Sequence, residues 1–412
     1  MQTNILFEPL QLPCGTVIKN RFFKSAMSEA LGTNDNKPSL LLPKLYQKWA
    51  EGGAGIIMTG NIMIDHTALG EPNNVVIENE ESVDLLQKWA DAGKQNGAHH
   101  WVQLNHPGKQ SPKFLSKEPV APSRIPLSGP VAKYFAPPRE LTEDEIIDTI
   151  KRFGHTASIV KKAGFTGVQI HAAHGYLINQ FLSPYHNQRS DQWGGSLENR
   201  MRFLLEVYSE IRHHVGDSFP IAIKLNSADF QRGGFTEEES IQVIQTLVKM
   251  KIDLIEISGG NYEKPMMMGK NVKESTQKRE AYFLEFARKA RAFAPQTPLV
   301  VTGGFRSVHA MEEACTSGAI DMLGIARPFV LIPDLPNQIR RGTYQTQNLP
   351  AIKTGIKPID KASLLENFWY EYQMARIGNG KTPHHHFNRL SFLLHILLTQ
   401  GTNLFQVRRN KR

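Results

Sequence analysis

Cysteine is scarce in this sequence, and its scarcity narrows the possible function classes. Only two cysteines occur among 412 residues, Cys14 and Cys315, and no C-x-x-C pair is present. A disulfide framework, a cysteine-ligated zinc site and an iron–sulfur cluster are therefore excluded. A reducing, cytoplasmic setting is expected, because such chains need no disulfides.

Long apolar runs and long basic stripes are also missing. The longest apolar run, Leu390–Leu398, has about half the length of a membrane-spanning helix, so no membrane span is expected. Lysine and arginine exceed the acidic residues by 48 to 39, which gives a net charge of +9. Much of this excess lies in small clusters such as the basic end Arg408–Arg412, without interleaved aromatics. Nucleic-acid binding is therefore not expected.

Apolar, strand-like segments alternate with amphipathic helical segments along most of the chain. Continuous apolar runs predict strands that are buried on both faces, as in a parallel sheet. About eight repeats predict an α/β fold with a single (β/α)₈ TIM barrel over residues 1–341. A doubly wound open sheet is the alternative, but no G-x-G-x-x-G follows the first strand. The strands are expected at Arg21–Met27, Ala54–Gly60, His99–Asn105, Gly164–Gly175, Ile221–Ser227, Asp253–Gly260, Pro298–Gly304 and Asp321–Phe329.

Two excursions and a tail interrupt this alternation. Ser111–Arg139 and Asn261–Arg279 are expected at the C-terminal face of the barrel, where ligands bind. Residues 342–412 are predicted to form a C-terminal helical extension, whose segment Leu364–Gly378 packs on the barrel or on a partner subunit. A homo-oligomer is thus possible. Helices are expected at Lys44–Gly55, Glu81–Gly97, Leu141–Gly164, Ser196–Gly216, Thr236–Met250, Glu280–Phe293 and Ser307–Ala319.

Three side chains near the tip of the fourth strand have the chemistry of a reaction centre. His171 and His174 can each donate a hydrogen bond to one oxygen atom, which polarises a carbonyl or nitro group. The phenol of Tyr176 can deliver a proton as a general acid. The alternatives are that the histidines are structural, or that they bind zinc together with a third ligand.

Other strand ends have residues suited to an anionic ligand. Lys224, inside the apolar run IAIKLNS, needs a partner when buried, and the pyrimidine end of a flavin would serve, alongside Gln103. A lysine whose ammonium reaches solvent at the strand end is the alternative. The segments VTGG and GIARPF provide Gly303, Gly304 and Arg327, which suit a phosphate.

Four segments together resemble one family, the Old Yellow Enzymes and the related NADH:flavin oxidoreductases. The resemblance covers residues 5–340, and its fourth-strand segment is highly specific. The four segments are LFEPLQLPCGTVIKNRFFKSAMS, VQLNHPGK, HAAHGYLINQFLSPYHNQRSDQWGGSLENRMRF, and the closing VTGGF with GIARPF.

The resemblance implies an FMN-dependent ene-reductase. Non-covalent FMN would take hydride from NADPH or NADH and pass it to the activated C=C bond of an α,β-unsaturated carbonyl or nitro compound. His171 and His174 would hold the substrate oxygen, and Tyr176 would protonate the substrate carbon. By the same resemblance the cofactor would contact Ser25, Ala26, Met27, Ser28, Gly60, Gln103, Lys224, Gly303, Gly304, Ala326 and Arg327.

Three residues depart from the family's pattern. Ser28 stands where members have threonine or cysteine, Lys224 where many have arginine, and Ala26 where proline is common. Lysine offers one point charge instead of a bidentate contact. Other hypotheses remain, namely a barrel lyase, aldolase or zinc hydrolase that uses the two histidines differently, and a non-catalytic flavin-binding barrel.

Overall fold

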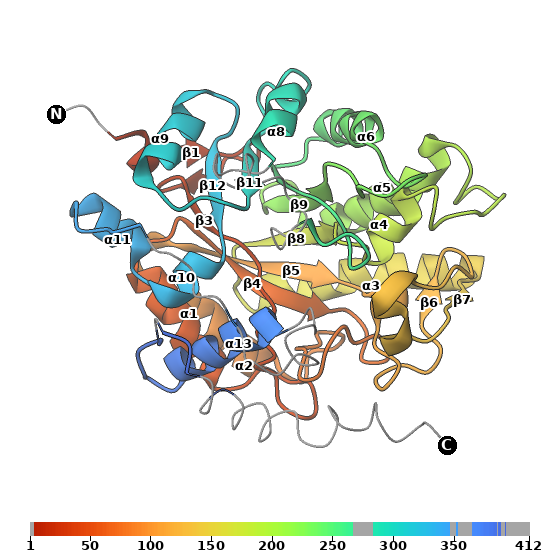
Figure 1. The fold of residues 1–412 in the computed structure, drawn as a ribbon, viewed down its shortest axis with the longest axis horizontal. Coiled ribbons are helices and arrows are strands. Elements are labelled where there is room, and N and C mark those ends of the chain that lie inside the picture. The colour runs from red at the N-terminus through yellow and green to blue at the C-terminus, as the bar shows by residue number, and fades with distance from the viewer. Residues whose placement is uncertain are drawn as a thin grey trace.

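Eight parallel strands close into a barrel in the computed structural model, which describes residues 4–266, 283–346, 352, 365–384, 386–388 and 392. The barrel closes because β3 pairs with both β4 and β12 (Figure 1). The predicted (β/α)₈ barrel is therefore confirmed. Its strands are β3 (Phe22–Lys24), β4 (Ile56–Met63), β5 (His99–Asn105), β8 (Gly167–Ala172), β9 (Ile221–Asn226), β10 (Leu254–Ser258), β11 (Leu299–Thr302) and β12 (Met322–Ile325).

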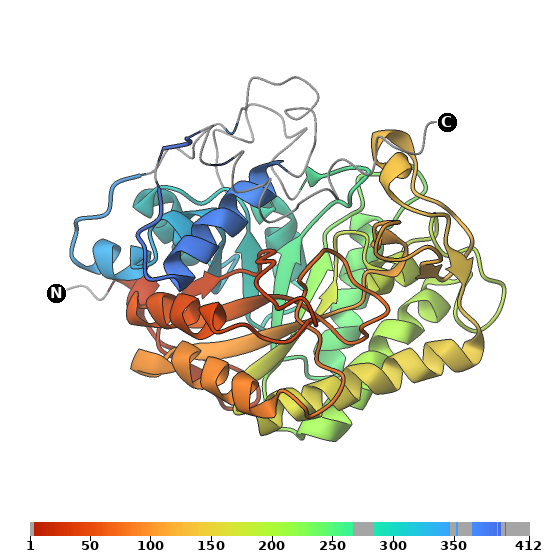
Figure 2. The ribbon, with the colours of Figure 1, turned by 90° about the horizontal axis from the view of Figure 1, so that it is seen from below.

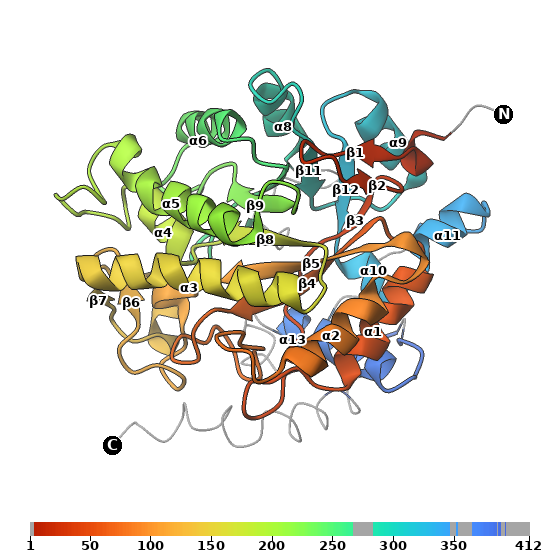
Figure 3. The same ribbon diagram turned by 180° about the vertical axis from the view of Figure 1, so that it is seen from behind.

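Helices that follow the strands cover the outside of the barrel (Figure 3). Two of them begin at the capping boxes Thr142/Glu145 and Thr236/Glu239, in which side chains satisfy the free N–H groups of the first turn. The main helices are α1 (Leu41–Glu51), α2 (Val83–Gly93), α3 (Glu143–Lys162), α5 (Leu197–Val215), α6 (Glu237–Lys249), α8 (Leu284–Arg291) and α9 (Val308–Thr316).

Shorter elements complete the described part of the chain. Several expected boundaries differ by a few residues. The eighth strand, for example, ends at Ile325 and not at Phe329, because Arg327 begins a short helix in which Pro328 follows. The short helices are α4 (Leu177–Leu182), α10 (Arg327–Leu331) and α11 (Leu335–Arg340), with 3₁₀ turns at Ile5–Phe7, Gln95–Gly97, Gly108–Gln110 and Gly129–Tyr134. The short strands are β1 (Leu10–Gln11), β2 (Val17–Ile18), β6 (Val120–Ala121) and β7 (Arg139–Glu140).

Side chains fill the barrel interior in layers that follow the two-residue period of a strand. An apolar cluster inside the barrel includes Trp101 of β5, Ala222 of β9 and Leu254 of β10. Two residues further along the same strands stand Gln103, Lys224 and Glu256, all buried. Since every second residue of a strand faces the same side, these polar groups form the next layer towards the C-terminal ends. The barrel interior therefore has an apolar layer, followed by a polar layer at the C-terminal ends of the strands, which form the mouth of the barrel.

One helix of the C-terminal extension packs on the barrel. This helix, α13 (Leu365–Gly378), lies beside α1 and α10, and Figure 2 shows it in blue next to α1 in red. Its Trp369 and Met374 are fully buried, so the expected packing of Leu364–Gly378 is observed within the chain itself from Leu365 onwards. The basic end Arg408–Arg412 and the run Leu390–Leu398, apart from Phe392, lie outside the described residues. No helix in the described ranges has the length and apolarity that a bilayer crossing requires.

Candidate active site

A buried carboxylate, Glu256 of β10, organises the polar layer of the barrel. Lys224 Nζ lies 3.1 Å from Glu256 Oε1, and Thr302 Oγ1 donates to the same oxygen at 2.6 Å. Gln169 Nε2 donates to Glu256 Oε2 at 2.8 Å. The partner that the buried lysine requires is thus a protein carboxylate. Sequence reasoning missed Glu256, although an acidic residue inside the apolar run LIEIS was a readable signal.

Two of the predicted cofactor residues join this network. Gln103 Nε2 donates to Gln169 Oε1 at 2.7 Å, and Ser25 Oγ lies 2.7 Å from Thr302 Oγ1. The chain of hydrogen bonds fixes both side chains at the mouth of the barrel. Lys224 belongs to the same network, so three predicted residues from β9, β5 and the end of β3 meet there.

The rings of His171, His174 and Tyr176 cluster at the C-terminal end of β8. The centroids of the two imidazoles are 5.1 Å apart, and that of His171 is 4.7 Å from the Tyr176 ring. His174 has a φ of 62° and Gly175 a φ of 80°, so the backbone turns through the left-handed region here. Such a conformation costs free energy for a non-glycine residue and tends to occur at functional sites.

Each imidazole has one ring nitrogen held by the protein. His171 Nδ1 accepts from the backbone N–H of Ala173 at 3.3 Å, so its own proton is on Nε2. His174 Nε2 lies 2.7 Å from Ser258 Oγ. Burial, together with the neighbouring charge of Lys224, lowers the pKa of both imidazoles well below the usual value. Both rings are therefore neutral near pH 7, and each has one N–H to donate.

A buried amide network supports the turn that contains His174. Asn226 Oδ1 accepts the N–H of His174 at 3.1 Å, and Asn179 Oδ1 accepts the N–H of Gly175 at 2.7 Å. Both amide groups donate to Asp229 Oδ1 at 3.1 Å. Sequence reasoning missed these supporting residues. A signal existed for Asn179, since the pair Asn-Gln interrupts the apolar run LINQFL of α4.

Ser28 contacts two carboxyl groups from distant parts of the chain. Its Oγ lies 2.5 Å from Glu71 Oε2 and 2.8 Å from Glu371 Oε1 of α13. One hydroxyl has one proton to donate, so the second contact requires a protonated carboxyl group. Burial raises the pKa of Glu71 to about 7 and, with the neighbouring charge of Glu71, that of Glu371 to about 8. The pair therefore retains a proton near neutral pH.

The predicted phosphate-binding residues lie between β11 and α10. Gly303 and Gly304 have φ values of 123° and 97°, where a side chain would be strained. Both are half-buried, as is Arg327, whose Nη1 donates to Glu366 Oε1 of α13 at 2.5 Å. Arginine has five N–H donors, so this contact leaves others for a second anion.

The backbone residues predicted for the flavin ring also come together. A Cβ on Gly60 would lie 2.8 Å from the carbonyl oxygen of Met27, so the absence of a side chain allows this close approach. Ala26 and Met27 follow β3 and are half-buried, as is Ala326 ahead of α10. Hydrogen-bond donors, a cation and unobstructed glycine backbone thus border one barrel mouth, and this donor set fits FMN.

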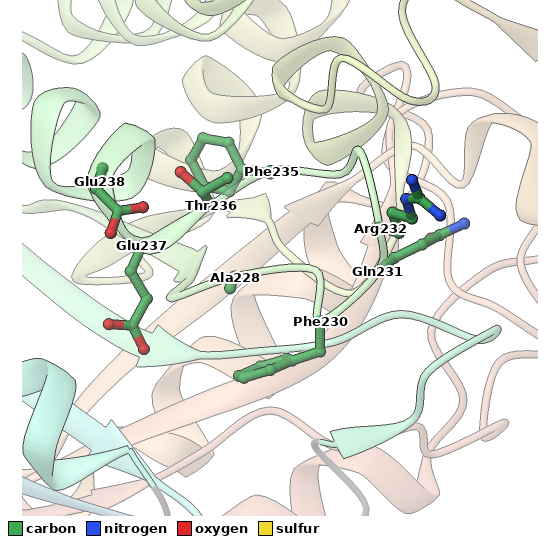
Figure 4. A pocket seen from close by; sticks show the side chains of 8 residues that line it. All are labelled: Ala228, Phe230, Gln231, Arg232, Phe235, Thr236, Glu237 and Glu238. Atoms are coloured by element: carbon green, nitrogen blue, oxygen red, sulfur yellow. The ribbon is translucent and has the colours of Figure 1, made fainter.

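Other concave or metal-like groups lie away from this cluster. Asp65, His66 and Glu78 are the metal-like group found within the described ranges, and neither His171 nor His174 belongs to it. A surface depression is lined by residues between β9 and the first turn of α6, and Figure 4 shows their side chains, among them Phe230 and Gln231. Among the residues that the structure describes, no third metal-ligating side chain groups with the two histidines.

The fold agrees with what comparison with known proteins shows. The model of the NADH:flavin oxidoreductase / NADH oxidase family matches residues 5–346. The chain belongs to this family. The family depends on FMN, with NADH or NADPH as hydride donor, and it includes the Old Yellow Enzymes. The protein is therefore a flavin-dependent oxidoreductase.

Several relatives are similar over most of the chain. The chain is 38% identical over 355 residues to the NADH-dependent flavin oxidoreductase iliE of Hypocrea jecorina, covering 80% of this chain and 88% of that protein. It is 31% identical to a cinnamate reductase of Clostridium sporogenes, covering 83% of this chain and 54% of the relative. A solved Old Yellow Enzyme homologue from Zymomonas mobilis superposes with a TM-score of 0.71 at 26% identity, covering 83% and 94% of the two chains.

Proposed function

We propose that this flavin oxidoreductase is an ene-reductase. It takes hydride from NADH or NADPH and delivers it to the activated C=C bond of an α,β-unsaturated carbonyl or nitro compound. The observation that supports this most is the cluster of two neutral imidazoles and a phenol at the C-terminal end of β8. The name of the cinnamate reductase agrees with such a substrate class.

The two imidazoles bind the substrate oxygen. The Ala173 contact uses Nδ1 of His171, so the N–H on Nε2 can donate to the substrate oxygen. When the Ser258 hydroxyl donates to His174 Nε2, the single N–H proton of this neutral ring is on Nδ1 and can be donated to the substrate oxygen. Two neutral donors stabilise the negative charge that grows on a carbonyl or nitro oxygen, and donors in a buried site act strongly.

Tyr176 supplies the proton. Its side chain is 8% exposed and its ring stands edge-on to that of His171 at an interplanar angle of 82°. Burial, followed by the nearby hydroxyl of Tyr262, raises the pKa of Tyr176 well above its usual value. The phenol therefore retains its proton until a strongly basic carbon, such as that of an enolate, accepts it.

The remaining predicted residues hold the cofactor. When bound, FMN accepts hydride from the nicotinamide and donates it to the alkene. Ala26, Met27, Ser28 and Gly60 would border the ring, together with Ser25, Gln103 and Lys224. Gly303, Gly304 and Arg327 would hold the phosphate, and Ala326 would also contact the cofactor. Glu256 balances the charge of Lys224.

Separate measurement of the two half-reactions tests this function. We expect NADH to bleach the flavin under anaerobic conditions, and cyclohexenone to reoxidise it, in stopped-flow absorbance traces. Tyr176→Phe keeps the ring but removes the proton, so it should slow the second step by about 10²–10⁴ and leave the first unchanged. Replacing His171 and His174 with alanine should slow enone reduction by at least about 10², since one such donor already contributes that much.

Two outcomes would contradict the proposal. A Tyr176→Phe enzyme that loses flavin reduction as strongly as enone reduction would refute the role of the phenol. A wild-type enzyme that is bleached by NADH but reoxidised by no enone or nitroalkene would point to the non-catalytic or electron-transfer alternatives.

A further inference from the structure

A second tyrosine, Tyr262, stands behind the proposed proton donor. Its hydroxyl oxygen lies 2.9 Å from that of Tyr176, and the two ring centroids are 5.9 Å apart at an interplanar angle of 72°. Tyr262 is half-buried and belongs to the excursion that follows β10. Sequence reasoning assigned no role to this residue.

The backbone around Tyr262 is built as a tight turn. Asn261 Oδ1 accepts the backbone N–H groups of Glu263 and Lys264, both at 2.9 Å. The other side of the amide group, Asn261 Nδ2, donates to Gln231 Oε1 at 3.2 Å. A parallel bridge also joins Asn261 to His174. The turn therefore fixes Tyr262 to the same backbone that positions His174.

The neighbouring side chains tie this turn to the first excursion. Glu263 Oε1 accepts the backbone N–H of Ser128 at 2.8 Å, and Glu263 Oε2 lies 3.8 Å from His186 Nε2. The ring of Phe135 packs on that of Tyr262, with centroids 6.1 Å apart. Two segments that are far apart in the sequence thus hold one phenol against Tyr176. A contact made by chance at the surface would not be supported by two separate segments in this way.

The direction of the shared hydrogen bond follows from the proposed chemistry. Two hydroxyl groups that share one hydrogen bond have one donor and one acceptor. Tyr176 can protonate a substrate only when its own hydrogen points to the substrate, which leaves its oxygen as the acceptor. We propose that Tyr262 donates to the oxygen of Tyr176, and that it is thereby a positioning residue for the proton transfer to the substrate.

This role has a consequence for the charge that the reaction creates. After hydride adds to the β-carbon, the electron pair of the C=C bond resides on the enolate. The O–H bond of Tyr176 then breaks, a C–H bond forms at the α-carbon, and a tyrosinate remains. The hydrogen bond from Tyr262 becomes charge-assisted at that moment, and such bonds are about twice as strong as neutral ones. A proton from water later restores the Tyr176 phenol.

The surroundings of the two phenols disfavour a tyrosinate, so the oxygen of Tyr176 needs a hydrogen-bond donor when it loses its proton. Burial is the main cause that raises the pKa of both phenols, and the contact with Tyr262 adds to the rise for Tyr176 when Tyr176 is the donor. The pKa of Tyr262 is raised to about 12, so Tyr262 retains its proton near neutral pH and can act as the donor. Burial thus opposes the formation of a tyrosinate at position 176. A hydrogen bond donated by Tyr262 stabilises the tyrosinate and offsets that opposition.

The test rests on the proposed function and uses the holoenzyme with NADH and cyclohexenone. Tyr262→Phe should slow enone reduction about ten- to a hundredfold, which corresponds to one hydrogen bond to a charged acceptor. The rate of flavin reduction and the dissociation constant of the enone should stay within about twofold, since neither involves the tyrosinate. Tyr208→Phe is the matched control and should leave both steps unchanged. It removes the hydrogen bond from the hydroxyl of Tyr208, on the outer helix α5, to the backbone carbonyl of Met250.

Two further variants separate a positioning role from a merely structural one. Combining Tyr262→Phe with Tyr176→Phe should cost no more than Tyr176→Phe alone, because Tyr262 acts through the other phenol. Replacing Tyr262 with 3-fluorotyrosine, a stronger donor of similar shape, should preserve the rate. Additive losses in the double variant, or a Tyr262→Phe enzyme with full enone activity while Tyr176→Phe is slow, would overturn this inference and leave the proposed function intact. A wild-type enzyme inactive towards enones would instead overturn the proposed function.

Discussion

Arg327 contacts a carboxylate of α13 and is also the residue proposed to bind the FMN phosphate. Replacing it with alanine removes a charge-assisted contact worth roughly 1.5–3 kcal/mol. The affinity for FMN should therefore fall about ten- to a hundredfold, measured by the quenching of flavin fluorescence as the apoprotein binds FMN.

Loss of the α13 contact has to be separated from loss of the phosphate contact. Glu366→Ala breaks the same ion pair but keeps the guanidinium, so its FMN affinity should stay within a few-fold of the wild type. Arg341→Ala removes an exposed arginine that pairs with Asp334, and it controls for net charge. If Glu366→Ala weakens FMN binding as much as Arg327→Ala, the guanidinium binds no phosphate.

Residues with one clear local signal could be predicted from the sequence, and their partners could not. His171 is near the end of a buried strand, and His174 and Tyr176 follow directly after that strand, so their convergence followed from the fold class. Glu256 reaches Lys224 from a neighbouring strand, and such a contact depends on register across the barrel. Glu371 reaches Ser28 across 343 residues. No spacing in the sequence indicates that pair.

Among the elements, α13 is expected to contribute to stability through the packing of its aromatic side chains. Its Trp369 is fully buried and packs edge-on against Phe387 and Phe392, with centroids 5.2 and 5.7 Å away. Trp369→Ala should lower the free energy of unfolding by about 3–5 kcal/mol, the usual cost of deleting a buried aromatic side chain. Denaturant titration of the holoenzyme measures this cost.

A neighbour on the same helix is the control. Phe368 is only half-buried, so Phe368→Ala should cost clearly less than Trp369→Ala. Equal losses would mean that α13 contributes through helix formation and not through the packing of Trp369. An unchanged midpoint in Trp369→Ala would contradict the packing of α13 on α1 and α10.

Elements with strong periodicity were predictable, and those without it were not. The capping box at Thr142 and the long apolar stripe of α3 indicated that helix almost to the residue. The short helix α10 was expected as part of a strand, because the run from Met322 to Phe329 is mostly apolar apart from Arg327 and gives no helical period. The docking position of α13 had no signal in the sequence, since it depends on tertiary contacts with α1.

For the whole molecule, buried ionisable groups determine how stability varies with pH. Burial lowers the pKa of His100 to about 3 and that of His106 to about 4, against about 6.5 in an unfolded chain. Between these values the unfolded chain binds more protons than the folded one. Folding stability from these histidines is therefore present above about pH 6.5 and is lost as the pH falls through the folded-state values. His171, His174 and His186 add to the same trend.

The pair of Glu71 and Glu371 acts in the opposite direction. Their folded-state pKa values of about 7 and about 8 exceed the unfolded value of about 4.3, so the folded protein binds more protons between these limits. The free energy of unfolding should then fall as the pH rises towards 8. Glu371→Gln keeps a polar group near Ser28 but cannot ionise. Its stability relative to the wild type should therefore increase between pH 6 and pH 8 by on the order of 1–2 kcal/mol.

Glu198→Gln, which changes an exposed carboxylate on α5, should instead give a curve parallel to that of the wild type. Urea titrations of the three proteins across this range measure the difference. A Glu371→Gln curve parallel to the wild type would show that the pair holds no proton, and that Ser28 is not shared between the two carboxyl groups.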